Sequence, residues 1–127
     1  MYTRVSDVYD GTIRPCITRE AGIRPVILAM SKGRLGAVAI VDGEERLEGI
    51  ITDGDLRRMM EKYDDVDGVT AKDVMSKSPK TISEDELAYN AYRMMEQNSI
   101  TQLVVVDKDR HYKGTVHIHD ILREGVD

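Results

Sequence analysis

The chain has 127 residues, of which 41% are hydrophobic and 32% charged, and its formal net charge is −5. This balance is typical of a folded globular protein and argues against a disordered chain. The acidic charge and the absence of a Lys/Arg cluster argue against nucleic-acid binding, and no apolar run approaches the roughly 18 residues of a membrane span.

A segment near the middle of the chain recurs 65 residues later. Residues 49–58 read GIITDGDLRR and residues 114–123 read GTVHIHDILR, so that the glycine, one aspartate and the last arginine match. A period of this length indicates two copies of a small folding unit. We expect the first copy at residues 1–63, a linker at 64–70, and the second copy at 71–127.

In the first copy, a short extended piece at 15–18 precedes a helix. Four apolar residues recur there at helical spacing, namely Ile23, Val26, Ile27 and Met30. Gly33 tolerates a left-handed conformation and is expected to end this helix. The continuous apolar run at 36–41 predicts a strand buried on both faces. A turn at Asp42 and Gly43 leads to a second strand at 47–51, and a helix at 53–62 closes the copy.

The second copy repeats this order. An extended piece at 80–83 precedes a helix that Ser83 is expected to start and Asn98 to end. Strands at 102–106 and 112–116 and a helix at 118–124 follow, and residues 125–127 are expected to fray. The chain is therefore predicted to be α/β, with two β-α-β-β-α units related by an approximate two-fold axis.

Thr52, Asp53, Gly54 and Asp55 stand where a strand meets a helix, and two interpretations remain open. In one, Thr52 and Asp55 form a capping box that only stabilises the helix. In the other, the helix N-terminus binds a phosphate, and Asp55 accepts the hydroxyls of a ribose. Gly49 would let a ligand approach the backbone, and Gly36 and Ala37 would open a slot for a flat ring.

The second copy departs from this pattern, because His117 replaces Thr52 and His119 replaces Gly54, while Asp120 matches Asp55. Imidazole is bulkier than a threonine side chain and is a different hydrogen-bonding group. We therefore expect a second pocket with a different ligand, or a closed one. Together with His111, these histidines also allow a minor metal hypothesis, beside polar lining and plain solvent exposure. No metal site is predicted.

No catalytic residue is predicted either, because the sequence shows no nucleophile paired with a base. Cys16 is the single cysteine and cannot form an internal disulfide, and no leader resembling a signal peptide is present. We therefore expect a cytoplasmic protein that requires no cofactor.

The repeat resembles a tandem CBS domain pair, or Bateman module, over nearly the whole chain. The residues that carry this resemblance are AKDVM at 71–75 and the segment at 49–58. The resemblance implies a regulatory module that binds an adenosine-containing ligand between its repeats and that forms a homodimer or a higher oligomer. It also implies that Thr52 holds phosphate or ribose and Asp55 the ribose hydroxyls. A ligand-free oligomerisation module is the alternative.

The same segment, with HIHDILREGV at 117–126, is similar to the C-terminal CBS pair of bacterial D-arabinose 5-phosphate isomerases. In that family a sugar-isomerase (SIS) domain precedes the pair and acts in Kdo and lipopolysaccharide synthesis. The resemblance implies AMP, ATP or CMP-Kdo as a ligand and the SIS domain as the partner. The 127 residues leave no room for that domain, so we expect a fragment or a stand-alone regulator.

Overall fold

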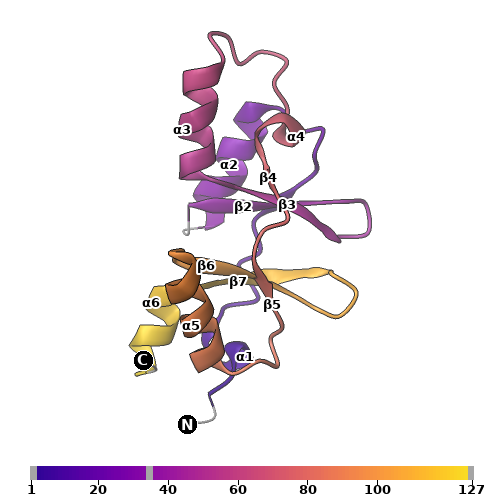
Figure 1. Ribbon diagram of the computed structural model, residues 1–127. Helices are drawn as coiled ribbons and strands as arrows, with labels where there is room; N and C mark the ends of the chain where they lie inside the picture. Colours follow the sequence, from indigo (N-terminus) through magenta and orange to yellow (C-terminus); the bar gives the residue numbers. More distant parts are fainter. Residues whose placement is uncertain (1–2, 34–35, 126–127) are drawn as a thin grey trace. The chain divides into compact units, whose positions relative to one another are not determined.

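A computed structural model of the chain describes residues 3–33 and 36–125. The chain divides into two compact units, one formed by Met1–Arg14 with Lys80–Asp127 and the other by Pro15–Pro79. Both units are α/β, as the sequence predicts (Figure 1). Within the described residues, no helix combines the length and apolar character needed to span a bilayer.

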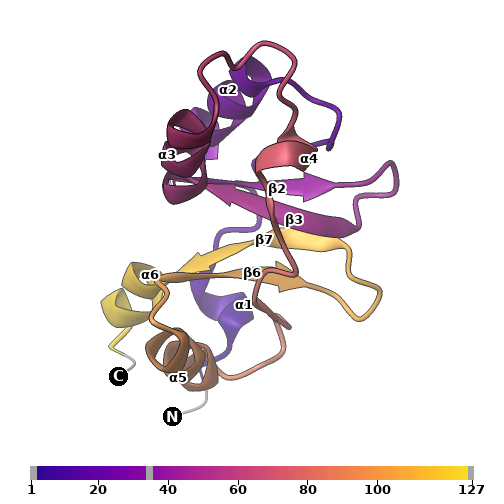
Figure 2. The ribbon, with the colours of Figure 1, turned by 45° about the horizontal axis from the view of Figure 1, so that its top comes forward.

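The unit of Pro15–Pro79 contains a four-stranded sheet. Its elements are β1 (Cys16–Ile17), α2 (Ile23–Gly33), β2 (Ala37–Val41), β3 (Leu47–Thr52), α3 (Asp53–Lys62), α4 (Ala71–Val74) and β4 (Ser76–Lys77). The strand order is β1-β2-β3-β4, with β1 parallel to β2 and the other pairs antiparallel. Helices α2 and α3 lie on the same side of this sheet (Figures 1 and 2). All five residues of β2 are buried, as its unbroken apolar run predicts.

The other unit repeats this plan with three strands. Its elements are α1 (Val5–Val8), β5 (Thr81–Ile82), α5 (Ala88–Asn98), β6 (Gln102–Val106), β7 (Tyr112–His117) and α6 (Ile118–Arg123). Strand β5 is parallel to β6, and β6 is antiparallel to β7. Its core cluster is aliphatic and includes Val5, Met95, Leu103 and Val116. The predicted order β-α-β-β-α is therefore confirmed in both units.

The two hairpins have matching turns. In the first, Asp42 accepts the backbone N–H groups of Glu44 and Arg46. Asp107 accepts those of Asp109 and His111 in the second. The left-handed residue is Glu45 in one turn and Arg110 in the other, with φ of 63° and 68°. The aspartates therefore hold these turns, and Gly43 is not needed for a left-handed backbone.

Two four-residue helices were not predicted, and each packs away from its own repeat. Val5 of α1 is fully buried in the core that Met95 and Leu103 also line, and its N–H donates to Glu86 O at 2.9 Å. Ala71 of α4 is buried with Val26 and Ile51. The compact units therefore divide the chain at 14/15 and 79/80, whereas the sequence repeat divides it at 63 and 70.

Two local predictions were wrong. Helix α5 begins at Ala88 and not at Ser83, because the Ser83 hydroxyl accepts the N–H of Asp85 in a separate turn. Ile27 is 48% exposed and does not join the buried stripe. Helix α5 does end at Asn98, as predicted, and the left-handed residue that follows it is Ser99, with φ 53°. Helix α2 does end at Gly33, and residues 126 and 127 of the expected frayed end lie outside the described residues.

Candidate ligand site

The turn between β3 and α3 is a complete capping box. Thr52 is the N-cap of α3, and its hydroxyl accepts the N–H of Asp55 at 3.4 Å. Asp55 Oδ2 in return accepts the Thr52 N–H at 2.9 Å and the Thr52 hydroxyl at 3.1 Å. The capping box predicted from the sequence is therefore confirmed.

The other oxygen of Asp55 is also engaged. Oδ1 accepts hydrogen bonds from Arg58 at 2.6 Å and from the Ser76 hydroxyl of β4 at 2.9 Å. Asp55 is only 5% exposed, and this burial by itself raises the pKa of the carboxyl. The bonds from Thr52, Arg58 and Ser76 outweigh that effect and hold the pKa of Asp55 below its ordinary value. The carboxylate is thus a buried, charged group with donors on both oxygens.

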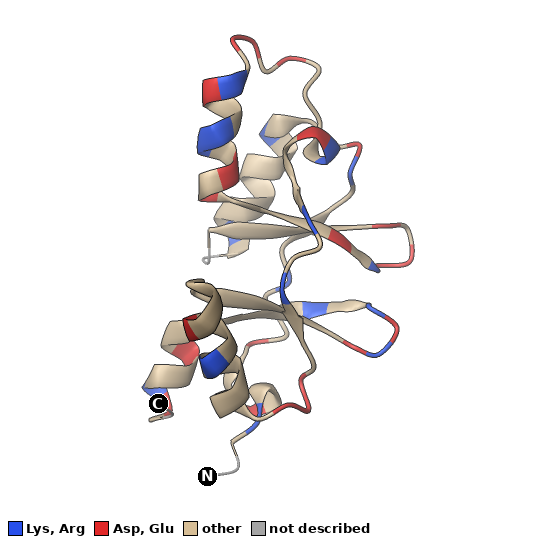
Figure 3. Ribbon diagram, in the orientation of Figure 1, with Lys and Arg blue, Asp and Glu red and all other residues tan. Residues whose placement is uncertain are grey.

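This engagement changes how a ligand can be bound. The N–H of Asp53 donates to Gly36 O, and that of Asp55 to Thr52, so these two amides of the helix start are not free for a phosphate. Asp53 and Asp55 also place two carboxylates in the first turn, and Figure 3 shows acidic residues there with basic ones further along α3. Negative charge at this position disfavours a phosphate on the helix axis and favours hydroxyl groups.

Gly36 and Ala37 lie beside Thr52 and Asp53, as the site hypothesis requires, but their small size has another cause as well. Gly36 has φ +64°, and a Cβ there would lie 2.6 Å from Asp53 Oδ2. Ala37 is 4% exposed and pairs with Thr52 across the two strands. Asp53 itself is exposed. The contact with Asp53 and the burial between the strands therefore account for the small residues at both positions without a ligand.

Gly49 does not face a ligand. A Cβ at this position would lie 2.7 Å from Met75 Sδ and 2.9 Å from Ser76 O. A Cβ at Gly114 would likewise lie 2.9 Å from the ring of Tyr9. These two matched glycines therefore allow a second chain segment to cross a strand, and the expectation that Gly49 admits a ligand was wrong.

The matching turn between β7 and α6 has the same frame with different groups. His117 is the N-cap, and its Nδ1 accepts the N–H of His119 at 3.1 Å. Asp120 accepts the His117 N–H at 2.9 Å and Arg123 at 2.7 Å. The rings of His117 and His119 stack with centroids 4.7 Å apart. Burial lowers the pKa of His117, nearby His119 lowers it further, and Asp120 opposes both. A neutral His117 can keep Nδ1 as an acceptor.

His111 is at the other end of β7 from His117, so the three histidines do not form one site. Its Nδ1 contacts Asp107 Oδ2 at 3.0 Å. Among the described residues, Asp107, Asp109 and His111 could offer ligand atoms within 4.8 Å of one another. Hydrogen bonds that hold the hairpin turn already occupy Asp107. This grouping is therefore explained by the turn.

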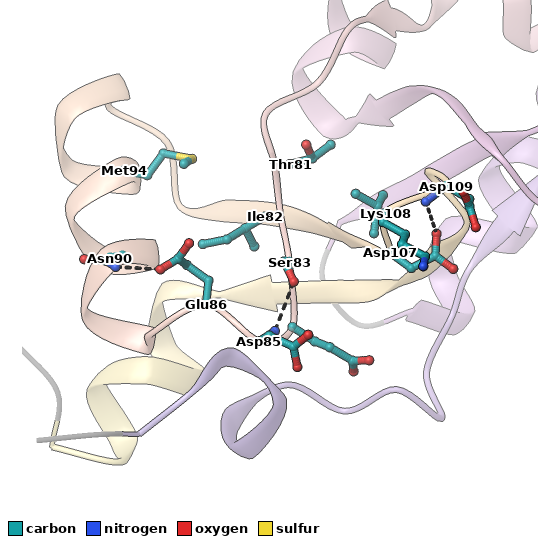
Figure 4. Close-up of a pocket in the computed structure, with 12 residues that line it drawn as sticks. Thr81, Ile82, Ser83, Asp85, Glu86, Asn90, Met94, Asp107, Lys108 and Asp109 are labelled. Carbon is teal, nitrogen blue, oxygen red and sulfur yellow. Dashed lines mark hydrogen bonds between the residues drawn. The ribbon is translucent and has the colours of Figure 1, made fainter.

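A cavity of about 810 Å³ lies elsewhere in the unit of β5, β6 and α5 (Figure 4). Its lining combines carboxylates with an apolar floor and includes Glu84, Asp85, Glu86, Asp107, Asp109, Ile82 and Met94. None of the predicted site residues lines it. Glu86 bonds to Asn90 at 2.7 Å, and Glu84 accepts the Tyr9 hydroxyl at 2.8 Å.

The predicted site residues thus fall into two groups on matched turns. Gly36, Ala37, Thr52, Asp53 and Asp55 lie together in one unit, and His117, His119 and Asp120 lie together in the other. Sequence reasoning missed Arg58 and Ser76 as partners of Asp55. The i+3 spacing could have indicated Arg58.

Comparison with known proteins agrees with the repeat. The model of the CBS domain matches residues 5–62 and again residues 71–127. The arabinose 5-phosphate isomerase KdsD of Yersinia pestis is 38% identical over 97% of this chain, and KpsF of Escherichia coli is 38% identical over 94%. The chain spans 38% and 36% of the length of these two relatives.

Two solved structures with the same fold contain adenosine compounds. The CBS domain pair of protein MJ0100, in complex with 5-methylthioadenosine and S-adenosyl-L-methionine, has a TM-score of 0.86 at 25% identity, covering 98% of this chain and 97% of that one. The CBS domain protein PAE2072 from Pyrobaculum aerophilum, complexed with AMP, has a TM-score of 0.81 at 25% identity, covering 93% and 89%. With the family match over both repeats, the chain belongs to the CBS domain family and carries two copies of that domain.

Proposed function

We propose that the chain is the regulatory CBS pair of an arabinose 5-phosphate isomerase and that it binds an adenine nucleotide or a nucleotide-sugar. The relatives at 38% identity and the adenosine compounds held by two similar structures support this proposal. Isomerisation would then belong to an SIS domain in another part of the protein. The observation that best supports a ligand site is the turn formed by Thr52, Asp53 and Asp55.

In this proposal the ligand replaces a partner of Asp55. Arg58 is 68% exposed and bonds to Oδ1 from outside, so a ribose hydroxyl can take its place. The released guanidinium would be free to pair with the phosphate of the same ligand. The phosphate would thereby avoid the carboxylates at the start of α3. The exposed carboxylate of Asp53 offers a second acceptor for a hydroxyl.

Regulation would follow from differential binding. A ligand that favours one arrangement of the pair shifts the equilibrium between two conformations of the attached enzyme. The shift cannot exceed the difference in the ligand's binding free energy for the two conformations.

The test is a thermal-unfolding screen of this chain with AMP, ATP and CMP-Kdo. At about 100 times its dissociation constant, a ligand that binds the folded state stabilises it by about 2.7 kcal/mol. Asp55→Asn should lose this stabilisation, because asparagine has one acceptor oxygen where aspartate has two. Asp120→Asn is the matched control, and it removes the same capping charge from the other turn while keeping the ligand effect. Equal loss in both variants, or no stabilisation by any ligand, would contradict the proposal.

A second function is favoured by exposed apolar side chains on α2 and α3. Ile27 is 48% exposed, Leu28 53% and Met60 67%. Ile27 and Leu28 also border a groove of about 620 Å³ with Val66 and Val69. Such a face fits the alternative of an oligomerisation module. Sedimentation of Ile27→Glu/Leu28→Glu beside the unchanged chain would test it, with a smaller species expected for the variant.

A further inference from the structure

Strand β5 is an edge strand, and the cavity of about 810 Å³ runs along it. Among the described residues, β6 is the one strand that pairs with β5. The N–H of Val104 donates to Lys80 O, and Thr81 lies opposite Val104 in the register. Bonding residues alternate along a strand, so the backbone N–H and C=O of Thr81 point away from β6. This edge is therefore open to a further strand on the side of the cavity.

The cavity has an apolar floor between two acidic sides (Figure 4). The floor is formed by Ile82, Met94 and Val106. One side is the segment after β5 and the other is the turn between β6 and β7, and together they contribute the carboxylates of Glu84, Asp85, Glu86, Asp107 and Asp109. Lys108 is the single basic residue of the lining. Within the part of the chain that the structure describes, none of the five carboxylates is paired with a lysine or an arginine.

The fold itself does not require this charge, as the first repeat shows. At the positions that match Glu84, Asp85 and Glu86, the first repeat has Arg19, Glu20 and Ala21. Arg19 pairs there with Glu20 at 2.9 Å and with Glu48 at 3.3 Å, so that segment balances its own charge. Crowded like charges oppose folding. Stability of the fold therefore does not account for the acidic sides of the cavity.

The arrangement of the carboxylates favours an extended ligand over a metal ion. Among the described residues, the acidic groups close enough to share an ion are Asp107 and Asp109 with His111, and Asp107 is held by the hairpin turn. The carboxylates after β5 do not join that group. By contrast, Asp85 and Asp109 stand on opposite sides of the floor, and neither carboxylate accepts a hydrogen bond from the described residues. Separated acceptors of this kind suit separate cations on one chain.

We propose that the edge of β5 docks an extended, basic segment of a partner protein. The main chain of the segment pairs with Thr81 and adds a strand to the sheet. An apolar residue of the segment covers the floor, and its lysine or arginine side chains meet the acidic sides. None of the residues of the proposed nucleotide site lines this cavity, so the docking surface is independent of that proposal.

The experiment is calorimetric titration of a short peptide of alternating lysine and valine, capped at both ends, into the full chain. The peptide should bind, and Asp85→Asn/Asp109→Asn should weaken it about tenfold, because two partly screened ion pairs are lost. Glu20→Gln/Glu44→Gln is the matched control. It removes the same charge from the matching positions of the first repeat and should bind as the unchanged chain does. Circular dichroism confirms that both variants fold.

Two further probes separate a docked strand from a site for small cations. The same peptide methylated at its backbone nitrogens keeps the charges but cannot donate to a strand edge, and it should not bind. Spermidine has amines without a peptide main chain and should bind much more weakly than the peptide. Equal binding of either probe would overturn the docked strand. Equal weakening by the two double variants, or no binding of the unmodified peptide, would overturn the proposal as a whole.

Discussion

Asp55 and Asp120 stand at matched positions but are held to different degrees. Asp55 accepts from Thr52, Arg58 and Ser76 and is 5% exposed. The side chain of Asp120 is 19% exposed and accepts from the His117 N–H and Arg123. The same residue type therefore fixes more of the surrounding structure in the first turn.

Asp55→Ala should cost roughly 2–3 kcal/mol of unfolding free energy, and Asp120→Ala about 1 kcal/mol. The larger cost arises because alanine removes a buried carboxylate that accepts hydrogen bonds from Thr52, Arg58 and Ser76. Urea unfolding of the two variants measures the difference. Equal costs would show that Ser76 and burial add nothing to the cap.

Local partners of a residue could be predicted from the sequence, and distant ones could not. The pair of Thr52 and Asp55 could be predicted because a capping box is local, with three residues between its ends. Ser76 is 21 residues from Asp55 and reaches it only because β4 pairs with β3. No local pattern contains that register.

At the scale of the element, α6 has a pH-sensitive start. Burial and His119 keep the pKa of His117 below its ordinary value of about 6.5, so below that pH the unfolded chain binds more protons than the folded one. This contribution to stability is complete above about pH 6.5 and is lost as the pH falls through the folded pKa. Protonation also removes the acceptor for the His119 N–H.

The unchanged chain should therefore lose unfolding free energy between about pH 7.5 and pH 5.5. His117→Asn should lose less, because asparagine caps a helix and does not titrate. Unfolding curves at both pH values measure the effect, and the NMR titration of the His117 ring gives its pKa directly. A ring pKa above 6.5 would contradict the mechanism.

A second prediction concerns the place where the segment of Met75 and Ser76 packs against Gly49 of β3. Gly49→Ala should cost about 1–3 kcal/mol, because its Cβ would meet Met75 Sδ at 2.7 Å and the backbone oxygen of Ser76 at 2.9 Å. Gly43→Ala is the matched control, since no atom lies within 4 Å of a Cβ there and the residue does not have positive φ. Thermal unfolding should show a lower midpoint only for Gly49→Ala. Equal midpoints would mean that β4 moves freely away from β3.

The elements that could be predicted are those that carry a period or an unbroken apolar run. Strands β2 and β6 and helices α2 and α3 follow from such patterns. Helices α1 and α4 have four residues each, too few to show a helical period. They are held by distant partners, since Val5 donates to Glu86 and Ala71 to Ala21. Helix α5 begins five residues after the predicted start, because Ser83 belongs to a separate turn that precedes the helix.

For the whole molecule, the main consequence is that one compact unit is built from two separated parts of the chain. The segment before Arg14 packs with the residues after Lys80. Val5 is fully buried in that unit, and the Tyr9 hydroxyl donates to Glu84 at 2.8 Å. Burial, followed by this bond, raises the pKa of Tyr9 to about 12. A repeat cut at residue 63 therefore separates the second copy from part of its own core.

Deleting residues 1–10 should destabilise the unit that contains β5, β6 and β7 and spare the one that contains β1 to β4. Loss of buried Val5 alone removes roughly 1.5–3 kcal/mol of apolar stabilisation, and the bonds of Tyr9 are lost with it. Hydrogen exchange should show reduced protection at 80–125 and unchanged protection at 15–79. Met30→Ala, which opens the core of the other unit, should give the reverse pattern. If the deletion lowered protection equally in both ranges, the segment would not belong to one unit, and the two cores would unfold as one.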